Sequence, residues 1–295
     1  MNNKLQKRFV HQGKKDKNYF EGWYIRLLNP TSKLNLACIF AYTRFQDDPH
    51  AFIQIYDGEK KRNTYYRFDI NLFRAEGNEV SIGDNHLSPE QLILKLDGFL
   101  LDVHFEDLTN IQANSAMGFL ANLPLQCYQE VVFMNGSAKG TLNSETIVAK
   151  PYMEKTFGKR FPKRWFWLQS NDFDNDLNFT LAGGHVPTLF FRPFGFFAII
   201  QFEDKEWIFG TYNGSKCRVK KTENHQYFSL SKGNKKVYIK AKRHHPVTLV
   251  GPSDYGKMDL DVYEDLNAEF SLKIYQDKTL IYESKGSFGG YEWMF

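Results

Sequence analysis

The chain has 295 residues, which is long for one domain and sufficient for two domains that each bury their own core. Its formal charge is +4 at pH 7, and lysine and arginine form no long block, which argues against a nucleic-acid-binding protein. Aromatic residues make up 16% of the sequence, including 27 phenylalanines, and this composition favours β-sheet because aromatic side chains suit half-buried pleated surfaces.

The ends and apolar stretches of the chain predict its location. Residues 1–17 are polar and basic and lack the apolar run of a signal peptide. The most apolar stretch, residues 186–202, is interrupted by Arg192 and Pro193 and is too short to span a bilayer. Three widely spaced cysteines fit a reducing compartment better than a disulfide scaffold. We therefore expect a soluble cytoplasmic protein.

Residues 34–45 alternate between large and small side chains with a period of two, as in a β-strand. The large side chains that share one face are Leu34, Leu36, Cys38, Phe40 and Tyr42. The small and polar side chains on the other face are Asn35, Ala37, Ile39, Ala41 and Thr43.

Dipeptides of glycine with asparagine or aspartate separate several alternating segments further along the chain. These residues supply the positive φ that tight hairpin turns require. The dipeptides are Asp97-Gly98, Asn135-Gly136, Asn213-Gly214 and Gly233-Asn234. We predict a β-hairpin at each of them.

Helical patterns are scarce, and Ser88-Pro89-Glu90-Gln91 predicts at most one helical turn. Many short strands with regularly spaced turns indicate an all-β sandwich or barrel, and a barrel of about eight strands has room for a small ligand. The alternation stops near Lys150-Pro151, where a segment rich in glycine, proline and basic residues follows. We therefore predict two antiparallel β domains, residues 1–150 and 151–295.

The first dense motif is Tyr19-Phe20-Glu21-Gly22-Trp23-Tyr24, in which a carboxyl group lies among aromatic side chains. A dry aromatic environment would favour the protonated form of Glu21 and make it a candidate proton donor. The alternative is structural: Trp23 closes the end of a barrel and Glu21 pairs with a base such as Arg26.

A second carboxyl group lies in the motif Tyr152-Met153-Glu154-Lys155, and Glu154 is the other candidate proton donor. The alternative is a core strand in which Glu154 pairs with Lys155 or Lys163.

The segment Trp165-Phe166-Trp167-Leu168-Gln169-Ser170-Asn171 predicts a strand with two indoles and two amides on one face. Such a surface is apolar at one end and hydrogen-bonding at the other. An aromatic wall of this kind can stabilise a passing carbocation, and the alternative is ordinary core packing.

These motifs resemble those of the tocopherol cyclase family and, more distantly, those of the carotenoid hydratase and hydroxyneurosporene synthase group. The stretches that carry the resemblance are Phe20-Glu21-Gly22-Trp23-Tyr24, Tyr152-x-Glu154-Lys155-x-x-Gly158 and Phe161-Pro162-x-x-Trp165-Phe166-Trp167-x-Gln169-x-Asn171. It continues through Cys127-Tyr128, Asn135-Gly136 and Gly290-Tyr291-Glu292-Trp293, and so spans nearly the whole chain.

The resemblance implies two lipocalin-like β-barrels and a lipophilic small-molecule ligand such as a prenylated quinol. It also implies a ring closure that needs no redox cofactor, in which an acid protonates the prenyl double bond and the phenolic oxygen traps the tertiary cation as a chromanol. Water has to be excluded, because water would capture the cation as an alcohol, which is the outcome in the hydratase relatives. The implied catalytic acids are Glu21 and Glu154, and the implied substrate-binding residues are Trp23, Tyr24, Tyr152, Trp165, Trp167, Gln169, Asn171 and His185.

Position 129 departs from the resemblance, which implies histidine where this sequence has Gln129. An amide cannot shuttle a proton, so this departure favours a second hypothesis, a non-catalytic carrier or sensor of small lipophilic ligands. A third hypothesis is a carbohydrate-binding protein, which predicts Trp165 and Trp167 at a solvent-open groove.

Three further patterns concern metal binding, a pocket mouth and membrane contact. His244 and His245 are adjacent, so on a strand they point to opposite faces and make a poor metal pair; we expect no metal site. Residues 183–187, Gly-Gly-His-Val-Pro, predict a loop at a pocket mouth with His185 as a polar gate. The phenylalanines of residues 189–200 are expected to pack in the core, line the pocket or touch a membrane surface from which ligand is drawn.

Overall fold

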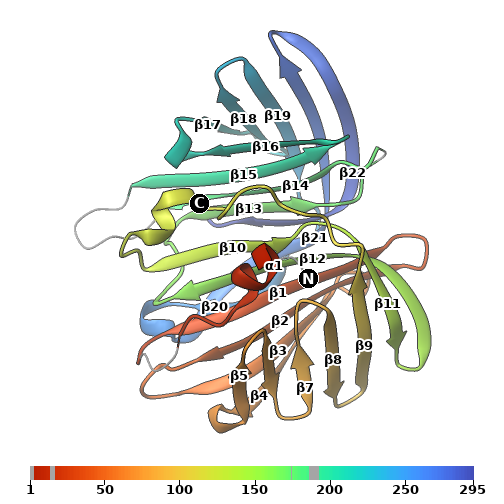
Figure 1. Cartoon of the computed structure of the whole chain (residues 1–295), viewed down its shortest axis with the longest axis vertical. Helices are drawn as coiled ribbons and strands as arrows, with labels where there is room; N and C mark the ends of the chain where they lie inside the picture. The colour runs from red at the N-terminus through yellow and green to blue at the C-terminus, as the bar shows by residue number, and fades with distance from the viewer. Residues whose placement is uncertain (1–2, 14–16, 174, 186–192) are drawn as a thin grey trace. The chain divides into compact units, whose positions relative to one another are not determined.

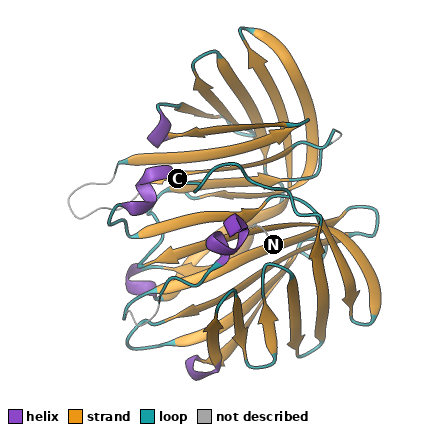
Figure 2. Cartoon of the chain, viewed as in Figure 1, coloured by secondary structure: helices purple, strands orange, loops and turns teal. Residues whose placement is uncertain are grey.

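The structure is a computed structural model that describes residues 3–13, 17–173, 175–185 and 193–295. Strands dominate it, and the helices are few and short (Figure 2). Two compact units are present, and the chain passes between them more than once. The first unit comprises Met1–Ile111, Gln126–Phe161 and Leu249–Asp261, and the second comprises Gln112–Leu125, Pro162–Thr248 and Val262–Phe295. The predicted all-β fold with two antiparallel sheets is confirmed.

The first sheet has twelve strands in the order β4-β3-β2-β1-β12-β11-β9-β8-β7-β6-β5, with β10 paired to β12 (Figure 1). Its strands are β1 (Phe20–Asn29), β2 (Leu34–Thr43), β3 (His50–Asp57), β4 (Arg62–Asp69), β5 (Phe73–Glu76), β6 (Glu79–Ile82), β7 (Asn85–Leu87), β8 (Gln91–Leu96), β9 (Phe99–Glu106), β10 (Cys127–Phe133), β11 (Ser137–Leu142) and β12 (Glu145–Gly158). The helical elements before β10 are α1 (Asn3–Phe9) and the 3₁₀ turns Ile70–Leu72 and Gly118–Asn122.

The second sheet has ten strands in the order β16-β15-β14-β13-β22-β21-β19-β18-β17, with β20 paired to β21. Its strands are β13 (Trp165–Ser170), β14 (Asn178–His185), β15 (Phe194–Phe202), β16 (Lys205–Gly210), β17 (Lys216–Lys221), β18 (Gln226–Lys232), β19 (Lys235–Lys242), β20 (Val247–Pro252), β21 (Met258–Gln276) and β22 (Thr279–Trp293). Short 3₁₀ turns cover Thr211–Asn213 and Asp254–Gly256. Among the described residues, no helix has the length and apolar character needed to cross a membrane.

Strand alternation determines which side chains of β1 and β2 form the core of the first unit. All five large residues of β2, from Leu34 to Tyr42, belong to one buried apolar cluster. The same cluster holds Trp23, Ile25 and Leu27 of β1. The odd-numbered side chains of β1 and the even-numbered side chains of β2 therefore share the inner face of this sheet.

Two of the four predicted hairpins are confirmed. Asp97-Gly98 joins β8 to β9, and Gly233-Asn234 joins β18 to β19. The predictions at Asn135-Gly136 and Asn213-Gly214 are wrong, because β10 pairs with β12 rather than β11 and β16 pairs with β15 rather than β17. In both places the chain turns but the next strand joins a partner distant in sequence, which a local turn signal does not reveal.

The predicted loop at Gly183-Gly184 is also wrong, since both glycines lie inside β14. A Cβ at Gly183 would lie 2.5 Å from the Phe166 ring, and one at Gly184 would lie 2.7 Å from the Arg164 carbonyl oxygen. The glycines are therefore needed for close packing against β13 rather than for a turn. The domain boundary expected at Lys150-Pro151 stays a prediction; both residues lie inside β12.

A substitution at Gly140 can test how closely β11 approaches β9. A Cβ at this position would lie 1.9 Å from the carbonyl oxygen of Asp102, so Gly140→Ala should push the two strands apart. We expect a loss of about 1–3 kcal/mol in the free energy of unfolding, measured by urea denaturation. The control is Lys139→Ala, an exposed neighbour on the same strand, which should cost less than about 1 kcal/mol. Equal effects of the two substitutions would contradict this packing.

Candidate functional site

The pairing of β1 with β12 separates the two candidate acids. Glu21 lies opposite Phe157, and Tyr24 lies opposite Glu154. Because successive side chains of a strand point to opposite faces, Glu21 points to the inner, apolar face of the sheet and Glu154 points to the outer face. The two carboxyl groups therefore belong to two different clusters.

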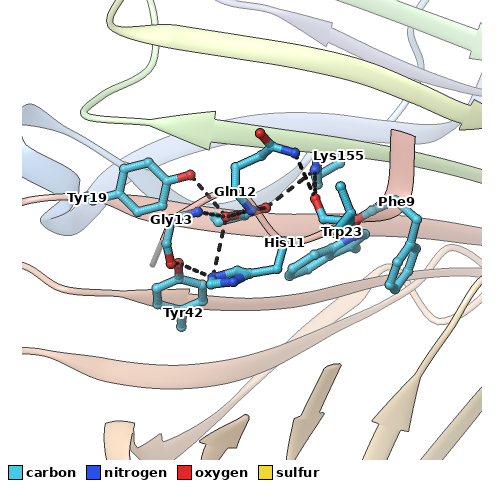
Figure 3. Close-up of polar contacts among 10 residues, drawn as sticks. Phe9, His11, Gln12, Gly13, Tyr19, Trp23, Tyr42 and Lys155 are labelled. Atoms are coloured by element: carbon cyan, nitrogen blue, oxygen red, sulfur yellow. Dashed lines mark hydrogen bonds and ion pairs between the residues drawn. The ribbon is translucent and has the colours of Figure 1, made fainter. Parts of the chain in front are cut away.

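The inner cluster is built around Glu21, whose side chain is fully buried. Figure 3 shows the polar contacts of this cluster, with His11, Gly13, Tyr19 and Lys155 among the labelled residues. Its carboxylate accepts hydrogen bonds from the backbone N–H groups of Gln12 (3.0 and 3.1 Å) and Gly13 (2.9 Å) and from the Tyr19 hydroxyl (3.0 Å). The Lys155 ammonium lies 3.4 Å from its Oε1 atom. The buried carboxyl group is thus paired with four donors, one of them charged.

A histidine and a tyrosine extend the inner cluster. The Tyr42 hydroxyl donates its single hydrogen to the Gly13 carbonyl (3.0 Å) and lies 2.7 Å from Nε2 of His11. Because that hydrogen is already used, His11 must donate from Nε2. The same nitrogen lies 3.7 Å from Oε2 of Glu21.

All of these contacts hold residues 3–13, the N-terminal segment, against the inner face of the sheet. The Trp23 indole donates to the Phe9 carbonyl (3.0 Å), and the Lys155 ammonium donates to the Val10 carbonyl. Phe9 is itself fully buried, with its ring centroid 5.4 Å from that of Trp23. Arg8 donates to two backbone carbonyls, those of Val131 and Ile111. The inner cluster is thus an anchor for this segment.

The anchor includes a lysine in an unusual environment. Burial lowers the pKa of Lys155, and the neighbouring Glu21 carboxylate opposes this effect by favouring the charged form. The ammonium also lies 5.9 Å from the Trp23 ring centroid and 5.1 Å from that of Phe157. The alternative in which Glu154 pairs with Lys155 is wrong. Neighbouring side chains of β12 point to opposite faces, and Lys155 points to the face that holds Glu21.

The outer cluster is built around Glu154. The Tyr152 hydroxyl donates to its Oε2 atom (2.6 Å), and the Gln129 side-chain amide donates to its Oε1 atom (2.8 Å). Gln129 is the residue found where the resemblance implies histidine, so this position contacts a candidate acid directly. Glu154 is 6% exposed, whereas Gln129 and Tyr24 are only half-buried, which leaves the cluster accessible at one side.

Aromatic and cationic groups surround the outer cluster. The ring centroids of Tyr24 and Tyr152 lie 6.5 Å apart with a steep interplanar angle of 70°. Arg26 lies opposite Tyr152 in the strand pairing, is fully buried, and donates to Oδ1 of Asn35 (3.0 Å). The inner face therefore holds Trp23 with Glu21, and the outer face holds Tyr24 and Tyr152 with Glu154.

In the second unit, the predicted tryptophan wall lies on β13. Phe166 and Leu168 point into the apolar core of this unit, so Trp165 and Trp167 point away from it. This differs from the expectation that the tryptophans line a barrel interior; phenylalanines and aliphatic residues fill that interior instead. The Trp165 indole donates to Glu292 (2.6 Å). Trp165 and Trp167 are 7% and 4% exposed, which argues against the solvent-open groove of the carbohydrate hypothesis.

The remaining predicted contacts are also in the second unit. Gln169 shares the face of Trp167 on β13 and is buried, as is Asn171 just beyond the strand. His185 ends β14, is half-buried, and its ring centroid lies 5.8 Å from that of Phe194. Val186 and Pro187, which would complete the predicted pocket mouth, lie outside the described residues.

The described residues contain no group of three or more histidine, cysteine, aspartate or glutamate side chains that could hold a metal ion. Burial raises the pKa of Cys127 to about 12 and that of Cys217 to about 12, so neither thiol is ionised near neutral pH.

Sequence reasoning missed the partners of both acids. Lys155 and Gln129 follow from strand alternation once the β1–β12 and β10–β12 pairings are known, but those pairings join residues far apart in sequence. His11 and Gly13 lie in a segment interpreted only as a polar N-terminus. Gly13 allows the close contact between this segment and β1, because a Cβ at this position would lie 2.1 Å from the Tyr19 ring.

Comparisons with known proteins agree with this architecture. The family model described as tocopherol cyclase-like matches residues 102–292. Among solved structures, a protein assigned as AttH from Nitrosomonas europaea matches with a TM-score of 0.52 and 14% identity, covering 94% of this chain and 92% of that one. Kievitone hydratase from Nectria haematococca matches with a TM-score of 0.52 and 11% identity, covering 93% and 88%. A search of curated proteins found no match.

The ion pair of the inner cluster can be tested by stability. Glu21→Gln removes the negative charge beside Lys155 and leaves a buried ammonium without its counter-charge, so we expect a loss of about 3–5 kcal/mol in the free energy of unfolding. The double variant Glu21→Gln with Lys155→Met should recover much of this loss in urea denaturation. The matched control is Glu106→Gln at the exposed Glu106–Lys139 pair, which should cost less than about 1 kcal/mol.

The lowered pKa of Lys155 predicts a pH dependence. Between its folded pKa and its ordinary value of about 10.4, the unfolded chain binds more protons than the folded chain, so stability should rise with pH in that window. The free energy of unfolding of the wild type, minus that of Lys155→Met, should therefore increase as the pH approaches about 10. A difference that is flat or falls with pH would show that Lys155 is not desolvated in this way.

Proposed function

The chain belongs to the tocopherol cyclase-like family, and we propose that it is an enzyme that binds a prenylated quinol or related isoprenoid and closes its ring by acid-initiated cyclisation. The observation that carries this proposal is the burial of the Glu154 carboxyl group beside the aromatic side chains of Tyr24 and Tyr152. A carboxyl group in a dry, partly aromatic environment is suited to general acid catalysis, because burial favours its protonated form.

Glu154 is a better proton donor than Glu21 in this proposal. The Glu21 carboxyl group contacts two backbone N–H groups of the N-terminal segment, a phenol and the Lys155 ammonium. Two of the groups that contact Glu154, the Tyr152 phenol and the Gln129 amide, lie on the opposite face, away from the N-terminal segment. We therefore assign Glu21 to anchoring the N-terminal segment and Glu154 to the reaction.

The proposed reaction needs no oxidant or cofactor. Glu154 gives its proton to one carbon of the prenyl double bond, whose π electrons form the new C–H bond and leave a tertiary cation on the other carbon. The quinol oxygen forms a C–O bond to that cation, and the quinol proton returns to Glu154 through the Tyr152 hydroxyl. This hydroxyl can donate and accept, so it can serve in both proton transfers. The product is an isomer of the substrate.

The aromatic rings beside Glu154 support the cationic step. A ring face stabilises a positive charge electrostatically, by about 0.5–2 kcal/mol when the charge is desolvated. Tyr24 and Tyr152 lie edge to face on the side of the sheet to which Glu154 points. Trp165, Trp167, Gln169, Asn171 and His185 stay predicted substrate contacts in the second unit.

A second candidate function is a non-catalytic carrier of lipophilic molecules. Gln129 favours it, because the amide fixes the Glu154 carboxyl group but cannot relay a proton. Capture of the cation by water would instead make the protein a hydratase, as the name of the structural neighbour kievitone hydratase suggests. The three outcomes differ in product mass: unchanged for cyclisation, heavier by one water for hydration, and no product for a carrier.

We expect purified wild-type protein to convert a prenylated hydroquinone into a chromanol of unchanged mass, detected by chromatography with mass spectrometry. Glu154→Gln should lower turnover by at least about 100-fold, because it removes the general acid. Tyr152→Phe should lower it less, since the acid itself is retained.

The control for folding is the thermal unfolding midpoint of each variant, which should stay near that of the wild type for Glu154→Gln and Tyr152→Phe. Full turnover by folded Glu154→Gln would refute its role as the acid. If the wild type binds the hydroquinone tightly but does not convert it, the carrier hypothesis would be supported and the enzyme hypothesis refuted.

A further inference from the structure

Basic residues that are scattered in the sequence gather on one face of the second sheet. In β17, β18, β19, β21 and β22 the apolar side chains alternate with polar ones, and the apolar set fills the core of the second unit. The polar set points to the opposite face. Its basic members, which we call the basic face, are Lys216, Arg218, Lys220, Lys236, Lys240, Lys242, Lys273 and Lys285.

The strand pairing aligns these residues in rows. One row runs Lys220, Tyr227, Lys240, Ser271 and Lys285 across the five strands. Tyrosine or serine separates the cations within it, which limits the repulsion that directly opposed like charges would cause. All three lysines of this row are exposed.

Basic side chains outnumber acidic ones on this face. Two acidic residues, Glu269 and Glu283, pair directly with members of the basic face, and Glu264 and Glu292 lie on the same side further along β21 and β22. Eight basic side chains therefore share the face with four acidic ones. Glu283 pairs with Lys273 (3.1 Å) and Glu269 with His244 (3.1 Å). At the rim, slight burial and the ammonium groups of Lys240 and Lys242 lower the pKa of His225, as a local positive potential requires.

Two ordinary explanations do not account for the basic face. Lysines on an edge strand protect a sheet from unwanted pairing, but only β17 lies at the edge, while β19 and β21 are interior strands of the sheet (Figure 1). Stability does not explain it either, because clustered like charges repel one another. The face is more consistent with binding an anionic partner.

Exposed tyrosines lie among the cations. Tyr227 and Tyr238 are 38% and 44% exposed, and the Tyr238 ring packs edge to face on that of Tyr275 at 5.6 Å. Tyrosine side chains are favoured at the level of lipid headgroups, where the ring is partly buried and the hydroxyl stays in water. Lysine and arginine near an anionic leaflet each contribute about 1 kcal/mol of attraction.

We propose that the basic face docks the protein on the surface of an anionic lipid bilayer. The choice of a bilayer over another polyanion rests on the proposed function, because a prenylated quinol resides in membranes and a docked enzyme can collect it there. Of the phenylalanines expected to touch a membrane, Phe196 and Phe197 are buried and Phe194 is half-buried, and Phe190 and Phe191 lie outside the described residues. The attraction is electrostatic and sensitive to salt.

The test uses the full chain and substrate-free vesicles in a sedimentation assay. Vesicles of phosphatidylcholine mixed with phosphatidylglycerol, about two to one, should bind the protein at low salt, and vesicles of phosphatidylcholine alone should not. Charge reversal of one row, Lys220→Glu with Lys240→Glu and Lys285→Glu, should weaken binding by about 100-fold. The control reverses three exposed lysines of the first unit, Lys33, Lys61 and Lys95, and should weaken binding far less.

Two results would overturn the proposal: equal weakening by both triple variants, and binding to a duplex DNA probe in preference to the anionic vesicles. Turnover is measured separately on hydroquinone dispersed in detergent, where docking is not needed. If the protein does not bind the vesicles but turns over the hydroquinone, only the docking proposal is refuted. If it binds the vesicles without turnover, only the proposed cyclisation is refuted.

Discussion

The antiparallel register of β1 against β12 is the constraint on which the rest of this account depends. It sets Tyr24 opposite Glu154 and Trp23 opposite Lys155, and a shift by one residue would exchange the two faces of β12. The register is held by the apolar cluster on one side, where Trp23, Ile25 and Met153 are fully buried. Because of this register, the neighbouring residues Glu154 and Lys155 belong to different clusters, Lys155 to the inner cluster and Glu154 to the outer cluster.

The inner cluster explains why so many polar groups can be buried in an apolar interior. Glu21, Lys155 and Tyr42 each contact backbone groups of the N-terminal segment, so that the segment and the sheet satisfy one another. The N-terminal segment thus packs against the inner face of the sheet of the first unit. The outer cluster differs because two of its members, Tyr24 and Gln129, are only half-buried.

Local patterns in the sequence predicted the features that depend on alternation. The all-β class and the hairpin at Asp97-Gly98 are confirmed, and residues 34–43 form a strand as their alternation indicates. What escaped prediction depends on pairing between distant strands: β10 beside β12, the glycines of β14 inside a strand, and the tryptophans of β13 directed away from the core. The basic face escaped for the same reason, since its lysines are distributed over five strands. Both acids were found in the sequence, but their partners required the fold.

Photoaffinity labelling tests the central claim that the accessible face of the β1–β12 pair receives the lipophilic substrate at Glu154. The probe is a hydroquinone whose prenyl chain carries a diazirine, and the labelled residues are mapped by peptide mass spectrometry. The account predicts labelling of Tyr24 or Gln129, suppressed by unlabelled prenylated hydroquinone. Competed labelling confined to Trp23 and Tyr42 on the inner face, with none near Glu154, would contradict it.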